Sequence, residues 1–166
     1  MARWDFKTTI FESFGTTETL THFAIKRLLP DKENYFKTLP GFTVKTNNDN
    51  ELILNKNKLI KESLCTKDLI KLKSESEFQW IGRSDNLINS GGVKIIPEEV
   101  EKKIQQHITT PFVIVGLTDE KFGEIVVLVS EGKTIEELNN TELNISKYEL
   151  PKKYFVLNEF PRTESG

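Results

Sequence analysis

The sequence has few residues that form disulfides or bind zinc. It contains one cysteine, Cys65, and two histidines, His22 and His107. A single cysteine excludes an internal disulfide, and so few cysteines and histidines argue strongly against a Cys/His zinc site. No GxxxxGK motif occurs either, so a Walker-type phosphate loop is absent from these 166 residues.

Long hydrophobic runs and a strong excess of one charge are also missing. No apolar stretch approaches the roughly 20 residues that span a bilayer, and residues 1–4 do not begin a secretory signal. The net charge is -2 and the sequence pI is about 5.8, which argues against a basic surface for nucleic acid. These features predict an ordinary cytoplasmic protein without nucleic-acid or membrane partners.

The most informative stretch is residues 82–101, GRSDNLINSGGVKIIPEEVE. Arg83 follows an apolar strand, so an always-charged guanidinium lies where a strand ends. Gly91 and Gly92 allow positive φ and a close approach of another molecule to the backbone. Pro97, followed by two glutamates, predicts the start of a helix. From these pieces alone, a plain strand, turn and amphipathic helix is the simpler interpretation.

The residues after this stretch alternate between helix and strand signals. Apolar residues repeat every fourth position in a helix expected over 97–108. Apolar strands over 112–116 and 125–129 are close enough to form an antiparallel hairpin. A capping box at 134–137 predicts a second helix, and a helix is also expected over 144–150 before a last strand at 154–157.

The first half of the chain has strand and turn signals. Residues 14–19, FGTTET, combine a glycine turn with three hydroxyls and one carboxylate, groups that suit phosphate and a divalent metal, although a polar turn is the simpler alternative. Short strands are expected over 20–24, 42–44, 52–54 and 78–81, with a hairpin tip at 47–50 and a further strand at 59–60.

Together, the GRxD segment and the preceding aromatic-Gly-x-Thr-Glu string resemble two motifs of the adenylate-forming superfamily, in the order found there. This superfamily includes acyl-CoA synthetases, luciferases and nonribosomal adenylation domains. The resemblance implies an α+β fold in two parts. Residues 1–84 would be the β-rich C-terminal part of a large AMP-binding domain, and residues 85–166 a small mobile domain with a three-stranded sheet and helices.

The resemblance also assigns roles within residues 14–19. Thr17 would bind the adenylate phosphate, and Glu18 would coordinate Mg²⁺, which makes both catalytic candidates. Gly15 would let the loop pass close to the adenine or acyl group, and Thr16 would add phosphate-binding donors.

Three further positions follow from the resemblance. Asp68 would accept hydrogen bonds from the ribose hydroxyls of ATP, since a carboxylate can accept from two vicinal hydroxyls. Lys67 stands where the superfamily has glycine, and it would cost about 1 kcal/mol if the backbone there needed positive φ. Arg83 would make the second ribose contact, and Asp85 would be the hinge between the two parts.

The reaction implied by the resemblance has two steps and needs ATP, Mg²⁺ and coenzyme A. A carboxylic acid attacks the α-phosphorus of ATP, which releases pyrophosphate, and the thiol of CoA then displaces AMP. In the second step, Gly91 and Gly92 would border the pantetheine tunnel.

The strings ESFGTTETLTHFA and DNLINSGGVKI are most similar to the o-succinylbenzoate-CoA ligase subfamily of menaquinone biosynthesis. The chain end, 160–166, resembles the final superfamily motif up to the residue before its lysine. We therefore expect a C-terminal fragment whose N-terminal part is missing and which is inactive alone. Two alternatives stay open: a non-catalytic module that binds adenylate or docks a partner, and an adenylation enzyme that uses a carrier protein in place of CoA.

Overall fold

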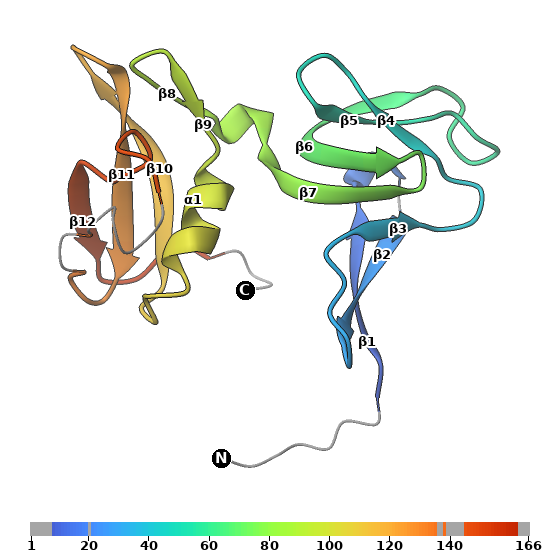
Figure 1. Cartoon of the computed structure of the whole chain (residues 1–166), viewed down its shortest axis with the longest axis horizontal. Helices are drawn as coiled ribbons and strands as arrows, with labels where there is room; N and C mark the ends of the chain where they lie inside the picture. The colour runs from blue at the N-terminus through green and yellow to red at the C-terminus, as the bar shows by residue number, and fades with distance from the viewer. Residues whose placement is uncertain (1–7, 20, 136–137, 139–144, 163–166) are drawn as a thin grey trace. The chain divides into compact units, whose positions relative to one another are not determined.

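The structure is a computed structural model that describes residues 8–19, 21–135, 138 and 145–162. The chain folds into two compact units, residues 1–81 and 82–166, each built around its own sheet (Figure 1). The sequence analysis divided the chain between residues 84 and 85 and placed a hinge at Asp85. That hinge stays a prediction.

The first unit contains a seven-stranded sheet in the order β1-β2-β3-β7-β6-β5-β4. A single 3-10 turn, η1, covers Thr17–Thr19 between β1 and β2. The strands are β1 (Ile10–Gly15), β2 (His22–Leu29), β3 (Phe36–Thr38), β4 (Val44–Thr46), β5 (Glu51–Leu54), β6 (Leu64–Ser74) and β7 (Glu77–Arg83).

Phenylalanines hold the first unit together. Phe23 and Phe78 are fully buried, and Phe36 is nearly so. The Phe14 ring lies 5.2–5.6 Å from the centres of these three rings, in edge-on and tilted contacts. Such pairs add about 0.5–1.5 kcal/mol each beyond the apolar area that they bury. This cluster therefore fixes β1, β2, β3 and β7 against one another, and it anchors the residue before Gly15.

The second unit contains a five-stranded sheet in the order β10-β11-β8-β9, with β12 paired to β11. It begins with the 3-10 turn η2 (Ser84–Asn86). Its other elements are β8 (Ile88–Ser90), β9 (Val93–Ile95), helix α1 (Pro97–Ile104), β10 (Phe112–Asp119), β11 (Gly123–Glu131) and β12 (Lys153–Leu157).

Helix α1 covers one face of the second sheet. Its Val100 and Ile104 are completely buried and pack with Ile114, Val126 and Leu128 of β10 and β11. Pro97 occupies the start of the helix, where its missing N–H leaves no unsatisfied donor. Apolar residues at four-residue spacing thus turn the buried side of α1 toward the sheet.

The antiparallel pairing of β10 with β11 confirms the predicted hairpin. The last strand is also confirmed, and it runs parallel to β11. The helix predicted over 97–108 exists but ends at Ile104. The sheet of the second unit is larger than predicted because β8 and β9 form a second hairpin around Gly91 and Gly92.

Two element predictions are wrong. Residues 59–60 are not a strand, because Asn57 folds that segment into a turn by accepting the backbone N–H groups of Leu59 and Ile60. Residues 145–150 form a turn and not a helix, and Glu149 closes it by accepting the Ser146 N–H at 2.7 Å. Most of the helix predicted after residue 134 lies outside the described residues. Among the described elements, α1 is the one α-helix.

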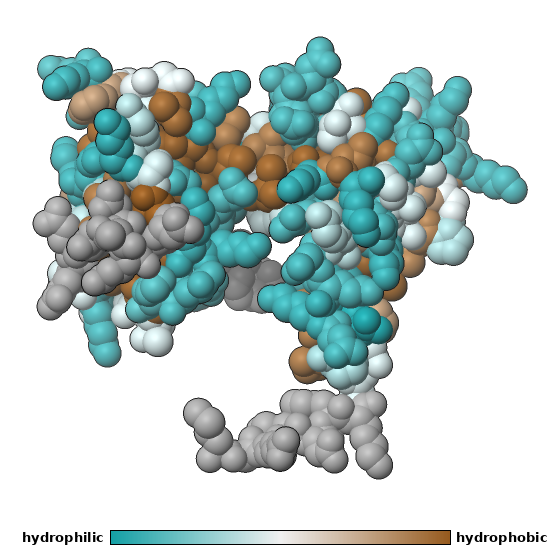
Figure 2. All heavy atoms as spheres, viewed as in Figure 1, coloured by the Kyte–Doolittle hydropathy of each residue, from teal (hydrophilic) through white to brown (hydrophobic). Residues whose placement is uncertain are grey.

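Hydrophilic residues cover much of the visible surface of both units (Figure 2). None of the described helices has the length and apolarity needed to cross a membrane.

Glu101 joins α1 to the sheet by a charged hydrogen bond. Its Oε1 accepts the N–H of Ile114 in β10 at 2.7 Å. Burial raises the pKa of the Glu101 carboxyl above its ordinary value of 4.5, the Ile114 N–H opposes the rise, and the charge of Glu98 adds to it. Ionisation of Glu101 therefore costs more in the folded than in the unfolded protein.

We expect Glu101→Gln to raise the Tm at pH 7. The amide oxygen can still accept the Ile114 N–H, and the buried charge is gone. A raised carboxyl pKa means that the stabilising contribution is complete below pH 4.5 and is lost as the pH rises through the folded-state pKa. The gain should thus vanish toward pH 4 in thermal unfolding followed by circular dichroism. Glu99→Gln, exposed on the same helix, is the control, and an equal gain in both variants would contradict the explanation.

Candidate functional site

The loop that contains Thr16, Thr17 and Glu18 is fixed at its start. Phe14 is held in the aromatic cluster, and a Cβ at Gly15 would lie 2.8 Å from the Thr21 carbonyl oxygen and the His22 Cα. Glycine is required there because the returning backbone passes too close for any side chain. The space for a Cβ at Gly15 is taken by β2, and the predicted approach of a ligand to this backbone stays a prediction.

Thr19 closes this loop from within. Its Oγ1 accepts the Thr16 N–H at 3.2 Å and donates to the Thr16 carbonyl or to the Thr21 carbonyl, at 2.8 and 2.6 Å. The Thr16 hydroxyl oxygen is buried and lacks a hydrogen-bond partner among the described residues. A buried hydroxyl of this kind is costly unless a partner satisfies it.

Thr17 and Glu18 are exposed on η1. Within the described part of the chain, no three Asp, Glu, His or Cys side chains gather closely enough to hold a metal ion. Mg²⁺ in nucleotide sites is commonly held by one or two carboxylates together with substrate phosphates. A single exposed carboxylate beside hydroxyls fits that kind of site, in which the nucleotide supplies most of the ligands.

Asp68 lies in a bulge of β6. Ile53 of β5 pairs with Cys65, and Glu51 pairs with Leu69, so three residues of β6 stand opposite Leu52 alone. These three are Thr66, Lys67 and Asp68. Bulges re-aim side chains at the edges of binding sites. The Thr66 Oγ1 accepts the Asp68 backbone N–H at 3.1 Å and so fixes the turn of the chain within the bulge.

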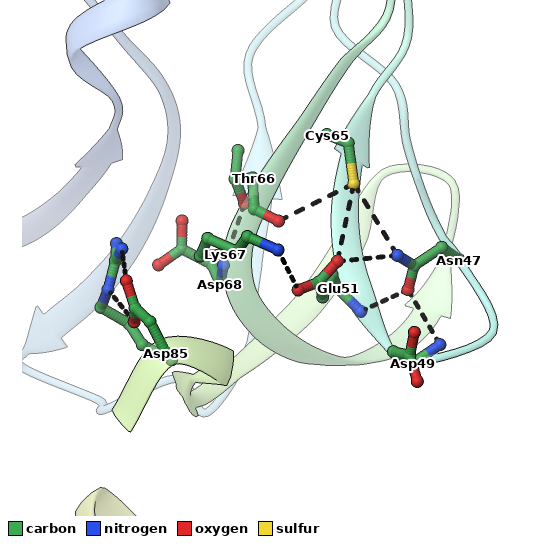
Figure 3. A network of polar contacts seen from close by, with 9 residues as sticks. Asn47, Asp49, Glu51, Cys65, Thr66, Lys67, Asp68 and Asp85 are labelled. Carbon is green, nitrogen blue, oxygen red and sulfur yellow. Dashed lines mark hydrogen bonds and ion pairs between the residues drawn. The ribbon is translucent and has the colours of Figure 1, made fainter. Parts of the chain in front are cut away.

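Glu51 of β5 organises a network of polar contacts beside the bulge (Figure 3). Its carboxylate is largely buried, and it accepts the Asn47 side-chain N–H at 2.8 Å and the Lys67 ammonium at 3.1 Å. The Cys65 sulfur lies 3.8 Å from the same carboxylate. Asn47 in turn accepts the backbone N–H groups of Asp49 and Glu51. The network ties the β4-β5 turn to the bulged strand.

Lys67 is not strained in this structure. Asn50 is the non-glycine residue with positive φ among the described residues, so the cost considered for lysine in place of glycine does not arise. The extended bulge accommodates a side chain at this position, and the ion pair with Glu51 gives the ammonium a partner.

Trp80 contacts the bulge from the neighbouring strand β7. It packs against the hydrophobic core of the first unit. Its indole N–H donates to the Oδ1 of Asp68 at 3.1 Å. Asp68 is 8% exposed, which is unusual for a charged side chain and shows how far its orientation is fixed by neighbours.

Arg83 belongs to the second unit and pairs with Asp85. Its Nε and Nη2 donate to the two carboxylate oxygens of Asp85 at 2.9 and 2.6 Å, in a bidentate arrangement. Both side chains are nearly half exposed, so water competes with the pair and it is worth at most about 1 kcal/mol. The predicted ribose contact and the predicted hinge residue are therefore in direct contact.

A hollow of about 460 Å³ lies beside this pair within the second unit. Its walls come from η2, β8, α1, β10 and β11, and they include the carboxylates of Asp85, Glu98, Glu101 and Glu124. Gly82 lies close to one wall, because a Cβ there would come within 2.5 Å of Glu98 Oε2 and Ile96 Cγ2. The glycine of the GRxD segment is thus explained by packing inside the second unit.

Gly91 and Gly92 form the tip of the β8-β9 hairpin with φ values of 58° and 81°. The Gly91 N–H donates to the Phe122 carbonyl at 2.9 Å. A Cβ at Gly92 would meet no atom within 4 Å. Here the backbone conformation requires glycine, and the surrounding space is open to another molecule.

The predicted site residues are divided between the units. Gly15, Thr16, Thr17, Glu18 and Asp68 lie in the first, and Arg83, Asp85, Gly91 and Gly92 lie in the second. Sequence reasoning missed the residues around Asp68, namely Asn47, Glu51 and Trp80. No local motif marks them, because the contacts that link them to β6 join residues 12–18 positions apart in the chain.

The chain has clear relatives among curated proteins, although no family model matches it. It is 34% identical over 106 residues to 3-oxocholest-4-en-26-oate–CoA ligase of Rhodococcus rhodochrous, a match that covers 60% of this chain and 19% of the ligase. It is 36% identical over 107 residues to 2-succinylbenzoate–CoA ligase of Bacillus cereus, covering 61% and 22%. The chain thus spans about a fifth of the length of these relatives.

The fold has a matching solved structure. O-succinylbenzoate coenzyme A synthetase of Bacillus subtilis, in complex with ATP and magnesium ion, superposes with a TM-score of 0.77 at 24% identity. The match covers 95% of this chain and 39% of that chain.

Asn47→Ala tests the network that holds the bulge. The change removes the acceptor of two backbone N–H groups and one donor to Glu51, so we expect a loss of about 1–3 kcal/mol in the free energy of unfolding. Asn48→Ala, exposed in the same turn, should change it by less than about 0.5 kcal/mol. Urea unfolding of both variants measures the difference, and equal values would show that the network is not stabilising.

Proposed function

Because the chain is a member of the adenylate-forming superfamily, related to a C-terminal part of the AMP-forming acid-CoA ligases, we propose that it contributes to ATP-dependent activation of a carboxylic acid. In the complete reaction, a carboxylate oxygen attacks the α-phosphorus of ATP and pyrophosphate leaves. The thiol of CoA then attacks the acyl carbon and AMP leaves. Chemistry of this kind depends on positioning and on neutralising charge, not on a protein nucleophile.

The observation that carries the proposal is the buried, oriented carboxylate of Asp68. It lies on a strand bulge, and its Oδ1 is held by the Trp80 indole N–H. A carboxylate whose direction is set in advance can accept the two vicinal hydroxyls of a ribose without first losing rotational freedom. We assign Asp68 to the ribose of ATP and of the acyl adenylate.

The loop of Thr16, Thr17 and Glu18 would bind the phosphate end of the same nucleotide. The unsatisfied Thr16 hydroxyl and the exposed Thr17 hydroxyl provide donors, and Glu18 provides one carboxylate for Mg²⁺. When bound, Mg²⁺ would neutralise phosphate charge and polarise the phosphorus under attack. The anchoring of Phe14 and the packing of Gly15 on β2 keep these donors at the end of a rigid strand.

Arg83 would make the second ribose contact by exchanging partners. Its pair with Asp85 is exposed and weak, so a nucleotide hydroxyl can replace part of it at little cost. We propose that Asp85, in the turn η2, is the hinge at which the small domain rotates between the two half-reactions. Release of the Arg83 guanidinium would then be linked to movement of the hinge.

Gly91 and Gly92 would border the path of the CoA thiol. Their positive φ values and the empty space around Gly92 leave an uncovered backbone at the hairpin tip. A pantetheine chain is thin and flexible and needs a channel without side chains. The same hairpin could serve a carrier-protein phosphopantetheine, which is the alternative acceptor.

For the acid, we propose o-succinylbenzoate, which would place the reaction in menaquinone biosynthesis. Support comes from the 36% identity to a 2-succinylbenzoate–CoA ligase. The 34% identity to a ligase of a steroid acid supports the reaction class equally and leaves other acids as competitors.

The second candidate is an adenylate-binding module without its own turnover. The residues assigned above, Asp68, Thr17 and Glu18, would bind the nucleotide and supply no nucleophile, so they fit binding without turnover as well. It predicts nucleotide binding without release of pyrophosphate, whereas an active ligase would release pyrophosphate when ATP, Mg²⁺ and o-succinylbenzoate are added together.

Calorimetric titration of AMP and of ATP with Mg²⁺ into the 166-residue protein tests the proposal. We expect saturable binding that falls at least about tenfold in Asp68→Ala, because the ribose hydroxyls lose a charged acceptor. Asp49→Ala is the matched control, an exposed aspartate of the same unit outside the bulge.

Two results would contradict the proposal. Absence of saturable binding would show that this chain has no nucleotide site of its own. Equal affinities of the Asp68→Ala variant and the unchanged protein would place the nucleotide elsewhere.

A further inference from the structure

We infer that Trp80 is a positioning residue for ribose recognition, and that its indole N–H sets the direction of the Asp68 carboxylate. The inference rests on the proposed function, since it assumes that Asp68 meets a ribose. It adds a residue that has no motif of its own and that acts on the nucleotide only through Asp68.

The hydrogen bond has the geometry for this role. The distance from Trp80 Nε1 to Asp68 Oδ1 is 3.1 Å, within the range of good N–H···O bonds. The indole nitrogen carries one hydrogen, which it donates to Asp68, so none is left for a ribose hydroxyl. Its contribution to a nucleotide site at this position is therefore indirect.

Trp80 is itself held in place. It is part of β7, and it packs against the hydrophobic core of the first unit. A donor on a fixed ring defines one point in space to which Oδ1 is drawn. The second carboxylate oxygen then has a defined direction too, because the carboxylate is planar and the Cβ position is fixed by the backbone.

Other contacts within the bulge hold its backbone. The Thr66 Oγ1 accepts the Asp68 backbone N–H, and Lys67 pairs with Glu51. These contacts set where the Asp68 side chain begins. The Trp80 N–H bonds the carboxylate itself and so helps to set where the side chain points, as recognition of two vicinal hydroxyls requires.

Trp80→Phe tests the inference, since it keeps an aromatic ring against the core and removes the N–H. We expect the affinity for AMP to fall about three- to tenfold, the worth of one hydrogen bond. The decisive readout is the ratio of affinities for AMP and for 2′,3′-dideoxy-AMP. The unchanged protein should prefer AMP because Asp68 receives both hydroxyls, and Trp80→Phe should lose most of that preference.

Two references complete the experiment. Trp4→Phe removes the only other indole from the chain and should leave both affinities unchanged. Asp68→Ala should abolish the preference and should also shift the indole N–H resonance of Trp80 in a proton–nitrogen NMR spectrum. That shift is measured without the Trp80→Phe variant, so the hydrogen bond can be tested even if that variant folds poorly.

The outcomes separate the inference from the proposed function. If Asp68→Ala loses the preference for AMP while Trp80→Phe keeps it, Trp80 has no positioning role and the proposed function stands. If Trp80→Phe weakens both nucleotides equally, the residue acts by packing alone, which also overturns the inference. An indole resonance that is unchanged in Asp68→Ala overturns it as well. If no nucleotide binds, the proposed function fails and the inference fails with it.

Discussion

The aromatic packing of Phe14, Phe23, Phe36 and Phe78 is the constraint on which the first unit depends. These rings come from four strands that are neighbours in the sheet but distant in the chain. The cluster also sets the functional geometry, because the phosphate-loop candidates begin directly after Phe14, and Trp80 lies two residues beyond Phe78. The same few large rings therefore stabilise the first unit and position its polar groups, which matters in a domain that has a small core.

The two units use polar groups differently. In the first, a buried carboxylate is surrounded by donors that fix it, as Glu51 and Asp68 both show. In the second, the Arg83-Asp85 pair is exposed and can be exchanged for other partners. Fixed groups suit recognition of a ligand that stays in place, and exchangeable groups suit the proposed hinge movement.

The sequence predicted local features well, but it predicted poorly the contacts between residues that are far apart in the chain. Three features depend only on neighbouring residues and could be predicted from the sequence: the proline at the start of α1, the continuous apolar runs in β10 and β11, and the glycines at a tight turn. The bulge that presents Asp68 depends on the register of β5 against β6, which no local pattern records. The need for glycine at positions 15 and 82 likewise comes from Thr21, His22, Ile96 and Glu98, contacts that exist only after folding.

The pairing of Lys67 with Glu51 couples two positions on neighbouring strands. Lysine fits at position 67 because the backbone there has no positive φ, and the Glu51 carboxylate across the strand pair accepts its ammonium. A glycine at position 67 would leave the largely buried Glu51 carboxylate with one fewer cationic neighbour and would favour a smaller or neutral residue at position 51. The two positions are therefore coupled, and a substitution at one of them changes the electrostatic environment of the other.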